Sequence, residues 1–579
     1  MRMPNMPAPP AAAARCLTLD PALPAQACAP TARRLPGGTA TRHACGSSRR
    51  AAGTGRASKK QARGSLDELT PARLTALIGQ CASVAELQRL LAQCGEGSLT
   101  PIHWTAAVSC LAQLPGRRPP KQQLALQCMQ RLQPLLPECQ GREVSSLLLS
   151  LARLHPASDL GDPSLQQQLP WQLLLEVLDR AADLGGSMTP QQLSVSIWAA
   201  SQLGVCSAAF SGAMQAAAAQ QLPRFEAQHL ANVAAGAASL AWDGSGDLVA
   251  ALLRRAAEQI RGEPVGRPGA ASEADGRPAA AASEAAAPAA GAAPEAAGAG
   301  SQEAASAQGP QGAAAGAAAG VMGVAAAAAP PAAPPAAAGQ PAALHAGFTM
   351  QGLTCLCWAA AVARLPMRAD ARGSLLPHVR TVCAAVEARQ AAGAGGGVVA
   401  TGKQQLFQLG IWLSQQGMEA SDLVGRQLYD ACEQAWRRQL AATQRRGGSG
   451  AAREVAALLQ QEAGSWGVRD VQVEAPAGPQ GLLSIDIAAT ATSSSGRAQA
   501  LALEVDGGHH YVRWLQPGGR PPTLAPTGET AFRDVMLGAW GYVVVCVPVH
   551  EWGACGGERA AQAELLRGLV LRGQRRRSC

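Results

Sequence analysis

The sequence predicts a mainly α protein, in which an α-solenoid of helical-pair repeats is followed by a small C-terminal α/β domain. Three observations lead to this fold class. Alanine is abundant and aromatic residues make up only 3 % of the 579 residues, which favours helices over β-sandwiches. One helical pattern recurs at intervals of 37 to 40 residues. Val-rich runs bounded by Gly and Pro gather near the C-terminus, and the length itself predicts at least two domains.

The chain begins with a basic segment. Residues 1–64 hold eleven Lys or Arg and a single acid, Asp20, among many Ala and Pro and a few Ser. This composition is typical of a disordered organellar transit peptide, and the alternative is a disordered basic tail. The Pro content and weak amphipathicity favour a chloroplast over a mitochondrion. Because this segment carries a net charge of +10, it leaves −1 for the rest, so the total charge does not identify a partner.

Helical repeats are predicted at 65–261 and 347–443. Residues 187–204 and 224–241 share one pattern, with Leu193 and Leu230 separated by 37 residues, and residues 348–365 restate it. Each unit opens with a Thr, Pro or Gln, continues with apolar residues at three- and four-residue intervals, and is followed by a second helical run. Such hairpins bury their apolar faces only by stacking, which is the pattern of an α-solenoid.

Two tryptophans, Trp198 and Trp358, recur at one position of these units. They lie inside the apolar run, so we expect them in the core and not as platforms for bases.

The repeats are interrupted by a low-complexity linker. Residues 262–346 consist mainly of Ala, Pro, Gly, Ser and Glu, without an aromatic residue or a lysine. Such a segment cannot bury a core, and we expect disorder or transient helix. The alanine runs here are broken by Pro and Gly, and no stretch of the chain predicts a membrane span.

The last domain is predicted at 453–572, with a core motif at 501–552. Thr527 or Thr530 is expected to cap a helix whose inner face carries Phe532, Val535, Met536 and Trp540. The elements expected in order are a helix at 453–466, strands at 471–474, 482–487 and 500–505, this helix, a strand at 542–547 and a helix at 561–571.

Acidic residues mark the ends of two of these strands. Asp486 lies in one strand, and Glu504 and Asp506 end the next. Carboxylates that meet at one sheet edge can hold Mg²⁺ and activate water for attack on a phosphodiester, with His510 supplying acid–base function. Contact with RNA without catalysis, and a purely structural role with Asp506 starting a turn, are the alternatives.

An ordered series of residues in the core motif resembles the RAP domain of organellar RNA-processing proteins. In that family an E-x-D-G-x-x-H-aromatic stretch precedes a G-x-T helix start and a strand that ends in Pro and Trp. Arg533 stands where a lysine is common. RAP domains are similar to PD-(D/E)XK restriction-endonuclease-like nucleases, but the E-x-K position here reads Glu504-Val505-Asp506 and lacks the lysine. The matching residues are Glu504, Asp506, Gly507, His510, Tyr511, Gly528, Thr530, Gly541, Pro548 and Trp552.

The helical units resemble octotricopeptide repeats, which bind RNA and often precede a RAP domain. The two resemblances together imply an organelle-targeted RNA-binding protein that acts in transcript processing, stability or translation. Its partners would be organellar single-stranded RNA and other RNA-processing proteins. Tyr511, Arg533 and Trp552 are the expected RNA contacts of the RAP domain, with bases stacking on the aromatic rings.

Two other functions remain open from the sequence. The first is a metal-dependent RNA endonuclease that uses Asp486, Glu504, Asp506 and His510, with Mg²⁺ as the cofactor. The second is a helical scaffold of the armadillo kind that binds proteins. RNA binding is distinguished from the scaffold by an affinity that falls with salt concentration.

Overall fold

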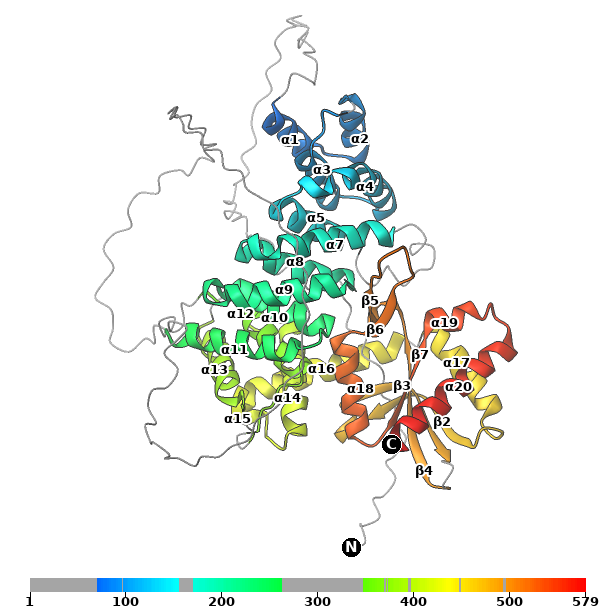
Figure 1. Ribbon diagram of the computed structural model, residues 1–579. Helices are drawn as coiled ribbons and strands as arrows, with labels where there is room; N and C mark the ends of the chain where they lie inside the picture. Colours follow the sequence, from blue (N-terminus) through cyan, green and yellow to red (C-terminus); the bar gives the residue numbers. More distant parts are fainter. Residues whose placement is uncertain are drawn as a thin grey trace, which may run out of the picture. The chain divides into compact units, whose positions relative to one another are not determined.

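Most of the described chain is helical, and a small α/β region forms its C-terminal end (Figure 1). The computed structural model describes residues 70–262 and 347–578, apart from 96, 156–169, 369, 370, 372, 394–396, 447, 448 and 493–495. This arrangement confirms the predicted mainly α fold class. The expected transit peptide at 1–64 and, apart from Gly262, the expected linker at 262–346 lie outside the described residues.

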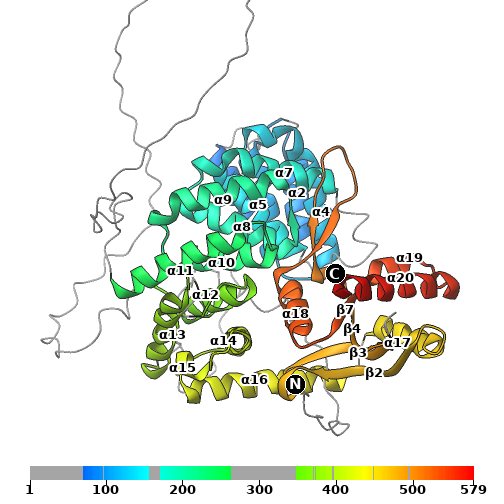
Figure 2. The ribbon, with the colours of Figure 1, turned by 60° about the horizontal axis from the view of Figure 1, so that its bottom comes forward.

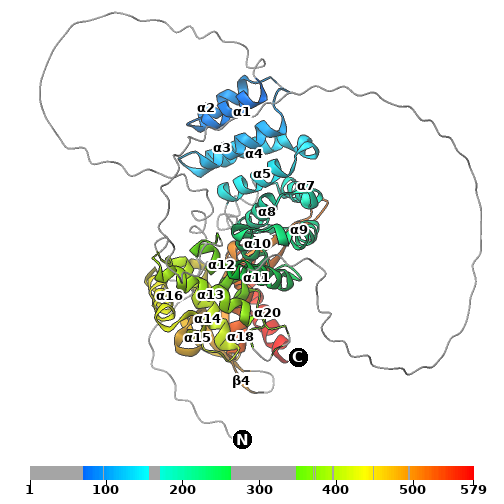
Figure 3. The ribbon, with the colours of Figure 1, turned by 90° about the vertical axis from the view of Figure 1, so that its left-hand side faces the viewer.

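A first row of helices runs through residues 71–446, and each helix contacts the next helix of the row. We call these the first-row helices. Their order can be followed in Figure 3. They are α1 (Pro71–Gln80), α3 (Pro101–Gln113), α5 (Gly141–Leu154), α8 (Pro190–Leu203), α10 (Ala227–Leu240), α12 (Met350–Val362), α14 (Ala400–Gln415) and α16 (Arg426–Arg446).

A second row packs beside the first. The 3₁₀ helix at Gln133–Glu138 connects α4 to α7, and from α7 onward each helix of this row contacts the next. Neighbouring pairs therefore bury one another's apolar faces. The helices are α2 (Val84–Gln93), α4 (Arg118–Leu132), α7 (Trp171–Leu184), α9 (Ala208–Gln221), α11 (Ser245–Arg261), α13 (Leu376–Ala391) and α15 (Ser421–Val424).

The polar residues that open the repeat units cap the first-row helices. In α8, Thr189 accepts a hydrogen bond from the backbone N–H of Gln192, whose side chain accepts from the backbone N–H of Thr189. Similar reciprocal capping opens α3, α5 and α10. Because these bonds satisfy backbone donors that a helix start leaves free, they fix where each repeat begins.

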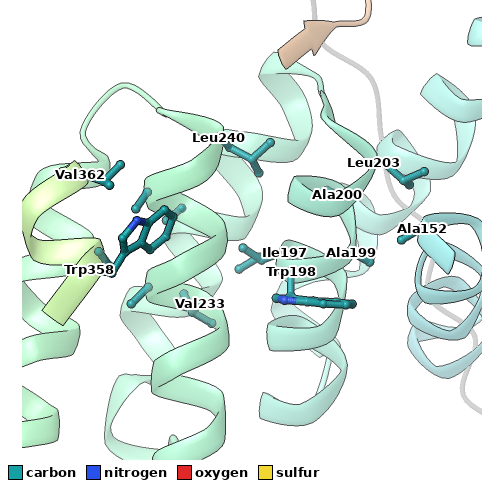
Figure 4. Packing of buried hydrophobic residues seen from close by; sticks show 14 of the residues in the cluster. Ala152, Ile197, Trp198, Ala199, Ala200, Leu203, Val233, Leu240, Trp358 and Val362 are labelled. Carbon is teal, nitrogen blue, oxygen red and sulfur yellow. The ribbon is translucent and has the colours of Figure 1, made fainter. Parts of the chain in front are cut away.

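Small side chains let neighbouring first-row helices approach closely. A Cβ atom added at Gly236 in α10 would lie 2.8 Å from Cγ2 of Ile197 in α8. Trp198 and Trp358 are 8 % and 5 % exposed and lie among the packed helices (Figure 4). Both tryptophans therefore belong to the core, as expected from the sequence.

The C-terminal region is built on one four-stranded sheet. The strand order is β2-β3-β4-β7, antiparallel except for the parallel pair β4–β7. The region begins at Gly450, three residues before the predicted boundary. Its elements are α17 (Gly450–Glu462), β2 (Val468–Ala477), β3 (Leu483–Thr492), β4 (Ala498–Asp506), α18 (Gly528–Ala539), β7 (Val543–Pro548), α19 (Val549–Ala554) and α20 (Arg559–Ser578).

Side chains along β4 alternate between the two faces of this sheet. Leu501 and Leu503 pack in a core with α17 and α20. Glu504 and Asp506 lie on the opposite face, where both contact Arg533 of α18. Helix α18 itself packs between β7 and the first-row helices α10, α12 and α14 (Figure 2), so these two acids are enclosed between the sheet and a helix.

A second, three-stranded sheet was not predicted. The stretch 511–526 was expected to be a loop, but it forms the hairpin β5 (Tyr511–Trp514) and β6 (Thr523–Pro526). Strand β5 pairs with β1 (Val205–Cys206), the connection between α8 and α9. The backbone N–H of Arg513 donates to the carbonyl of Gly204 at 2.8 Å, so the hairpin is hydrogen bonded to the helical repeats.

The inner face of α18 differs from the prediction at Val535 and at Trp540, which is the half-buried C-cap residue after the helix. Phe532 and Met536 are buried, but Val535 is 37 % exposed and Leu537 is buried in its place. The reason is that α18 is covered from two sides, by the repeats and by β7. Thr527 caps the helix by accepting from the backbone N–H of Thr530.

Candidate functional site

Glu504, Asp506, Arg533 and Asp534 form a buried charged cluster at the end of β4. Nη1 of Arg533 lies 3.1 Å from Oε2 of Glu504 and 3.1 Å from Oδ1 of Asp506. Nη2 donates to both oxygens of Asp506, at 3.1 and 3.3 Å, and to Oδ1 of Asp534 at 3.0 Å. Glu504 and Asp506 are 0 % and 1 % exposed, so this one guanidinium pairs with two carboxyl groups that water does not reach.

The charged cluster sets the protonation of its neighbours. Burial opposes the ionisation of Asp506, but Arg533 and His510 outweigh it and hold the pKa of this carboxyl below its ordinary value. Burial lowers the pKa of His510 to about 3, against the attraction of Asp506. Nδ1 of His510 lies 3.2 Å from Oγ1 of Thr530 and 3.6 Å from Oδ1 of Asp506. His510 is therefore a neutral imidazole at pH 7.

The predicted magnesium site is not formed by these residues. Within the described ranges, no group of three His, Cys, Asp or Glu residues is arranged to hold a metal ion. The guanidinium of Arg533 contacts both Glu504 and Asp506 in the position that a cation would take. Asp486 turns to the backbone, where its Oδ2 accepts from the N–H of Val505 at 2.8 Å. The expected metal ligands Asp486, Glu504 and Asp506 thus do not fit Mg²⁺.

The expected catalytic role of His510 does not fit either. An imidazole with a pKa of about 3 carries no excess proton to donate at pH 7 and is a weak base. Its contacts with Asp506 and Thr530 connect the end of β4 to the start of α18. The structure therefore supports a positioning role for His510 between these two elements.

The aromatic residues predicted to contact RNA are enclosed. Trp552 is 3 % exposed, and its Nε1 donates to Oε2 of Glu454 in α17 at 3.3 Å. Tyr511 is 9 % exposed, and its ring meets the imidazole of His550 edge-on. Neither ring offers a free face for a base, and Arg533 is committed to carboxylates, so the three expected contacts Tyr511, Arg533 and Trp552 are structural in this arrangement.

A cavity of about 70 Å³ adjoins the charged cluster and was missed by the sequence analysis. Its walls come from α14, α16, the start of β3 and the first turns of α18. Burial raises the pKa of Glu529 in this wall to about 7. No sequence signal marked Gln408 or Trp436, because a polar or aromatic residue at a helical spacing is ordinary. The lining residues are Gln408, Trp436, Leu483, Ser484, His509, His510, Thr527, Glu529, Thr530, Phe532 and Arg533.

A row of long polar side chains follows the first-row helices. In each of α5, α8, α10, α12 and α14, such a residue stands two positions before the first buried Val or Leu of the repeat pattern. Side chains next to the row connect neighbouring helices: Oε1 of Gln191 lies 3.0 Å from Nε2 of His229, and Gln351 donates to Gln405. We call Arg142, Gln191, Gln228, Gln351 and Gln404 the polar row; all five are exposed or half-buried.

No protein-family model and no curated protein matches the chain. In the part of the chain that the structure describes, no helix has the length and apolar character needed to cross a membrane.

Proposed function

We propose that this chain is an organelle-targeted RNA-binding protein of post-transcriptional RNA metabolism. The paired helices would be an α-solenoid of octotricopeptide-like repeats that reads single-stranded RNA. The C-terminal region would be a RAP domain of restriction-endonuclease-like fold that contacts the same RNA. The protein would act in transcript processing, stability or translation. The organelle would be the chloroplast, or alternatively the mitochondrion.

The polar row carries this proposal. Each amide of the row offers one acceptor and two donors, the groups that recognise the edges of unpaired bases. Gln191, Gln228 and Gln351 present them at one repeat position on successive first-row helices. One polar side chain per helical pair is the arrangement that reads one base per repeat.

The charged cluster supports binding in place of cleavage by the C-terminal region. A metal-dependent nuclease needs carboxylates that are open to a divalent cation. Here Arg533 already pairs with both Glu504 and Asp506. We therefore assign the C-terminal region a role in holding RNA and in fixing the end of the repeats.

The proposal is tested by the affinity of the full chain for single-stranded organellar RNA, measured by fluorescence anisotropy at several salt concentrations. Replacing Gln191, Gln228 and Gln351 together by Ala should weaken binding by about tenfold or more, since each lost hydrogen bond contributes about 0.5–1.5 kcal/mol. Affinity should also fall linearly with the logarithm of salt concentration.

A matched control replaces glutamines of the second row. Gln123 and Gln130 of α4 and Gln220 of α9 are all exposed, and their joint replacement by Ala should leave the affinity unchanged. Equal losses in the two triple variants would refute the polar row as the RNA-reading surface. A chain that binds RNA with no salt dependence would refute the proposed function.

A further inference from the structure

The cavity joins the end of the helical repeats to the C-terminal region. Gln408 projects from α14 and Trp436 from α16. The opposite wall consists of Leu483 and Ser484 at the start of β3 and the first turns of α18, which include Glu529. A molecule in this cavity would touch both regions at once.

Two polar side chains in these walls lack a protein partner. Gln408 is 8 % exposed, and its amide makes no hydrogen bond within the described residues. The carboxyl of Glu529 likewise has neither a hydrogen bond nor an ion pair in this part of the chain. Neither side chain has a polar atom that is both fully buried and unpaired, so the two groups are open to the cavity and can serve a ligand as hydrogen-bond donors and acceptors.

The charges around the cavity favour a neutral ligand. Arg533 lines the cavity, but its guanidinium is shared among Glu504, Asp506 and Asp534. Burial lowers the pKa of His509, which leaves this imidazole neutral at pH 7. Because no positive charge remains uncompensated, a phosphate group would meet nearby carboxylates without a free cation, and an uncharged polar ligand is favoured.

The volume and the lining of the cavity further restrict the chemical class of the ligand. Trp436 and Phe532 contribute aromatic side chains to the lining. The volume of about 70 Å³ has room for roughly five water molecules, since one water needs about 10–15 Å³ on this scale. That is the size of one small heterocycle. A lining that combines aromatic side chains with an amide and a carboxyl suits a planar ring that carries hydrogen-bonding groups.

We propose that the cavity binds one unstacked nucleobase of the bound RNA, with Gln408 and Glu529 hydrogen bonding to its edge. The inference rests on the proposed function and adds a specific site to it. Gln408 stands one helical turn after Gln404, the last member of the polar row. An RNA strand that follows the row therefore reaches the cavity at its end, where one base turns out of the strand and inserts between Trp436 and Phe532.

The test is an abasic scan of one RNA. A single-stranded RNA is selected from a randomised pool by the full chain, and each of its bases is removed in turn. In the wild-type protein, removal of the inserted base should weaken binding by about tenfold. In Gln408→Leu, the intact RNA should bind about tenfold more weakly, and removal of that same base should have no further effect. In Glu529→Leu, on the opposite wall, removal of the same base should likewise no longer weaken binding.

Gln415→Leu is the matched control, because Gln415 is an exposed glutamine of the same helix. In this variant, removal of each base should weaken RNA binding by the same factor as in the wild-type protein. If Gln408→Leu and Glu529→Leu also show the wild-type scan, the cavity does not bind a base, although the RNA-binding function stands. If the wild-type chain selects no RNA from the pool, the proposed function fails and the base site fails with it.

Discussion

Replacing Gly528 by alanine should separate the helical repeats from the C-terminal region. Gly528 is the first residue of α18, and a Cβ atom built there would lie 1.9 Å from the carbonyl oxygen of Ala238 in α10 and 2.8 Å from Cγ1 of Val362 in α12. The first contact is with backbone, which cannot rotate away as a side chain does. Because overpacking of a buried contact costs about 1–3 kcal/mol, we expect Gly528→Ala to lower the free energy of unfolding by about 3 kcal/mol.

The measurement is urea denaturation of the full chain, with Gly538→Ala as the control. Gly538 lies in the same helix and has no atom within 4 Å of an added Cβ. An alanine there should stabilise the chain by about 0.5–1 kcal/mol, since glycine disfavours a helix interior. The two variants should therefore shift the urea midpoint in opposite directions. If Gly528→Ala unfolds at the wild-type midpoint, the close packing of α18 against α10 described above is wrong.

Three further substitutions test the charged cluster, the cavity wall and the repeat core. Arg533→Met leaves Glu504 and Asp506 buried without their shared cation, so the free energy of unfolding should fall by about 3–5 kcal/mol; an unchanged urea midpoint would contradict the ion pairs. Burial raises the pKa of Glu529 to about 7, so the folded chain holds this proton more tightly than the unfolded chain. The resulting stabilisation is complete below the pKa of the unfolded carboxyl and is lost as the pH rises through about 7. Glu529→Gln should reduce the change of melting temperature with pH between about pH 5 and pH 7. An unaltered slope would show that another group titrates there. Trp358→Ala removes an indole that is 5 % exposed and should destabilise the chain by about 3–5 kcal/mol; a loss below about 1 kcal/mol would place Trp358 outside the core.

Local patterns predicted the paired helices and most of the C-terminal elements. The apolar spacing around Leu193 and Leu230 predicts one buried helix face. The pattern can be recognised because each helix is longer than ten residues and repeats the spacing over several turns. The run from Val543 to Pro548 forms β7 as expected. The cap at Thr527 was also readable, because its hydroxyl acts on the next turn of its own helix.

Features that depend on distant partners were not predictable. Strand β1 has only two residues, too few for any alternation to show. The partners of Arg533 depend on how α18 packs over β4, and a sequence motif does not specify contacts between separate elements. A sequence also cannot tell that Tyr511 and Trp552 face inward, since aromatic residues suit a core as well as a base. The magnesium hypothesis failed for the same reason: it placed three acids at one edge and omitted the arginine between two of them.

The pairing of β1 with β5 has a consequence for the order of folding. Val205 and Arg513 face each other in the register of these strands, although about 300 residues separate them along the chain, and contacts of such long range form late. The helical pairs can assemble one after another as synthesis proceeds. The backbone donors and acceptors of β1, between α8 and α9, stay unpaired until the hairpin has been synthesised and has folded. An unpaired strand edge is a template for wrong association. A nascent chain, or one truncated before residue 511, therefore exposes an aggregation-prone edge that only the completed C-terminal region protects.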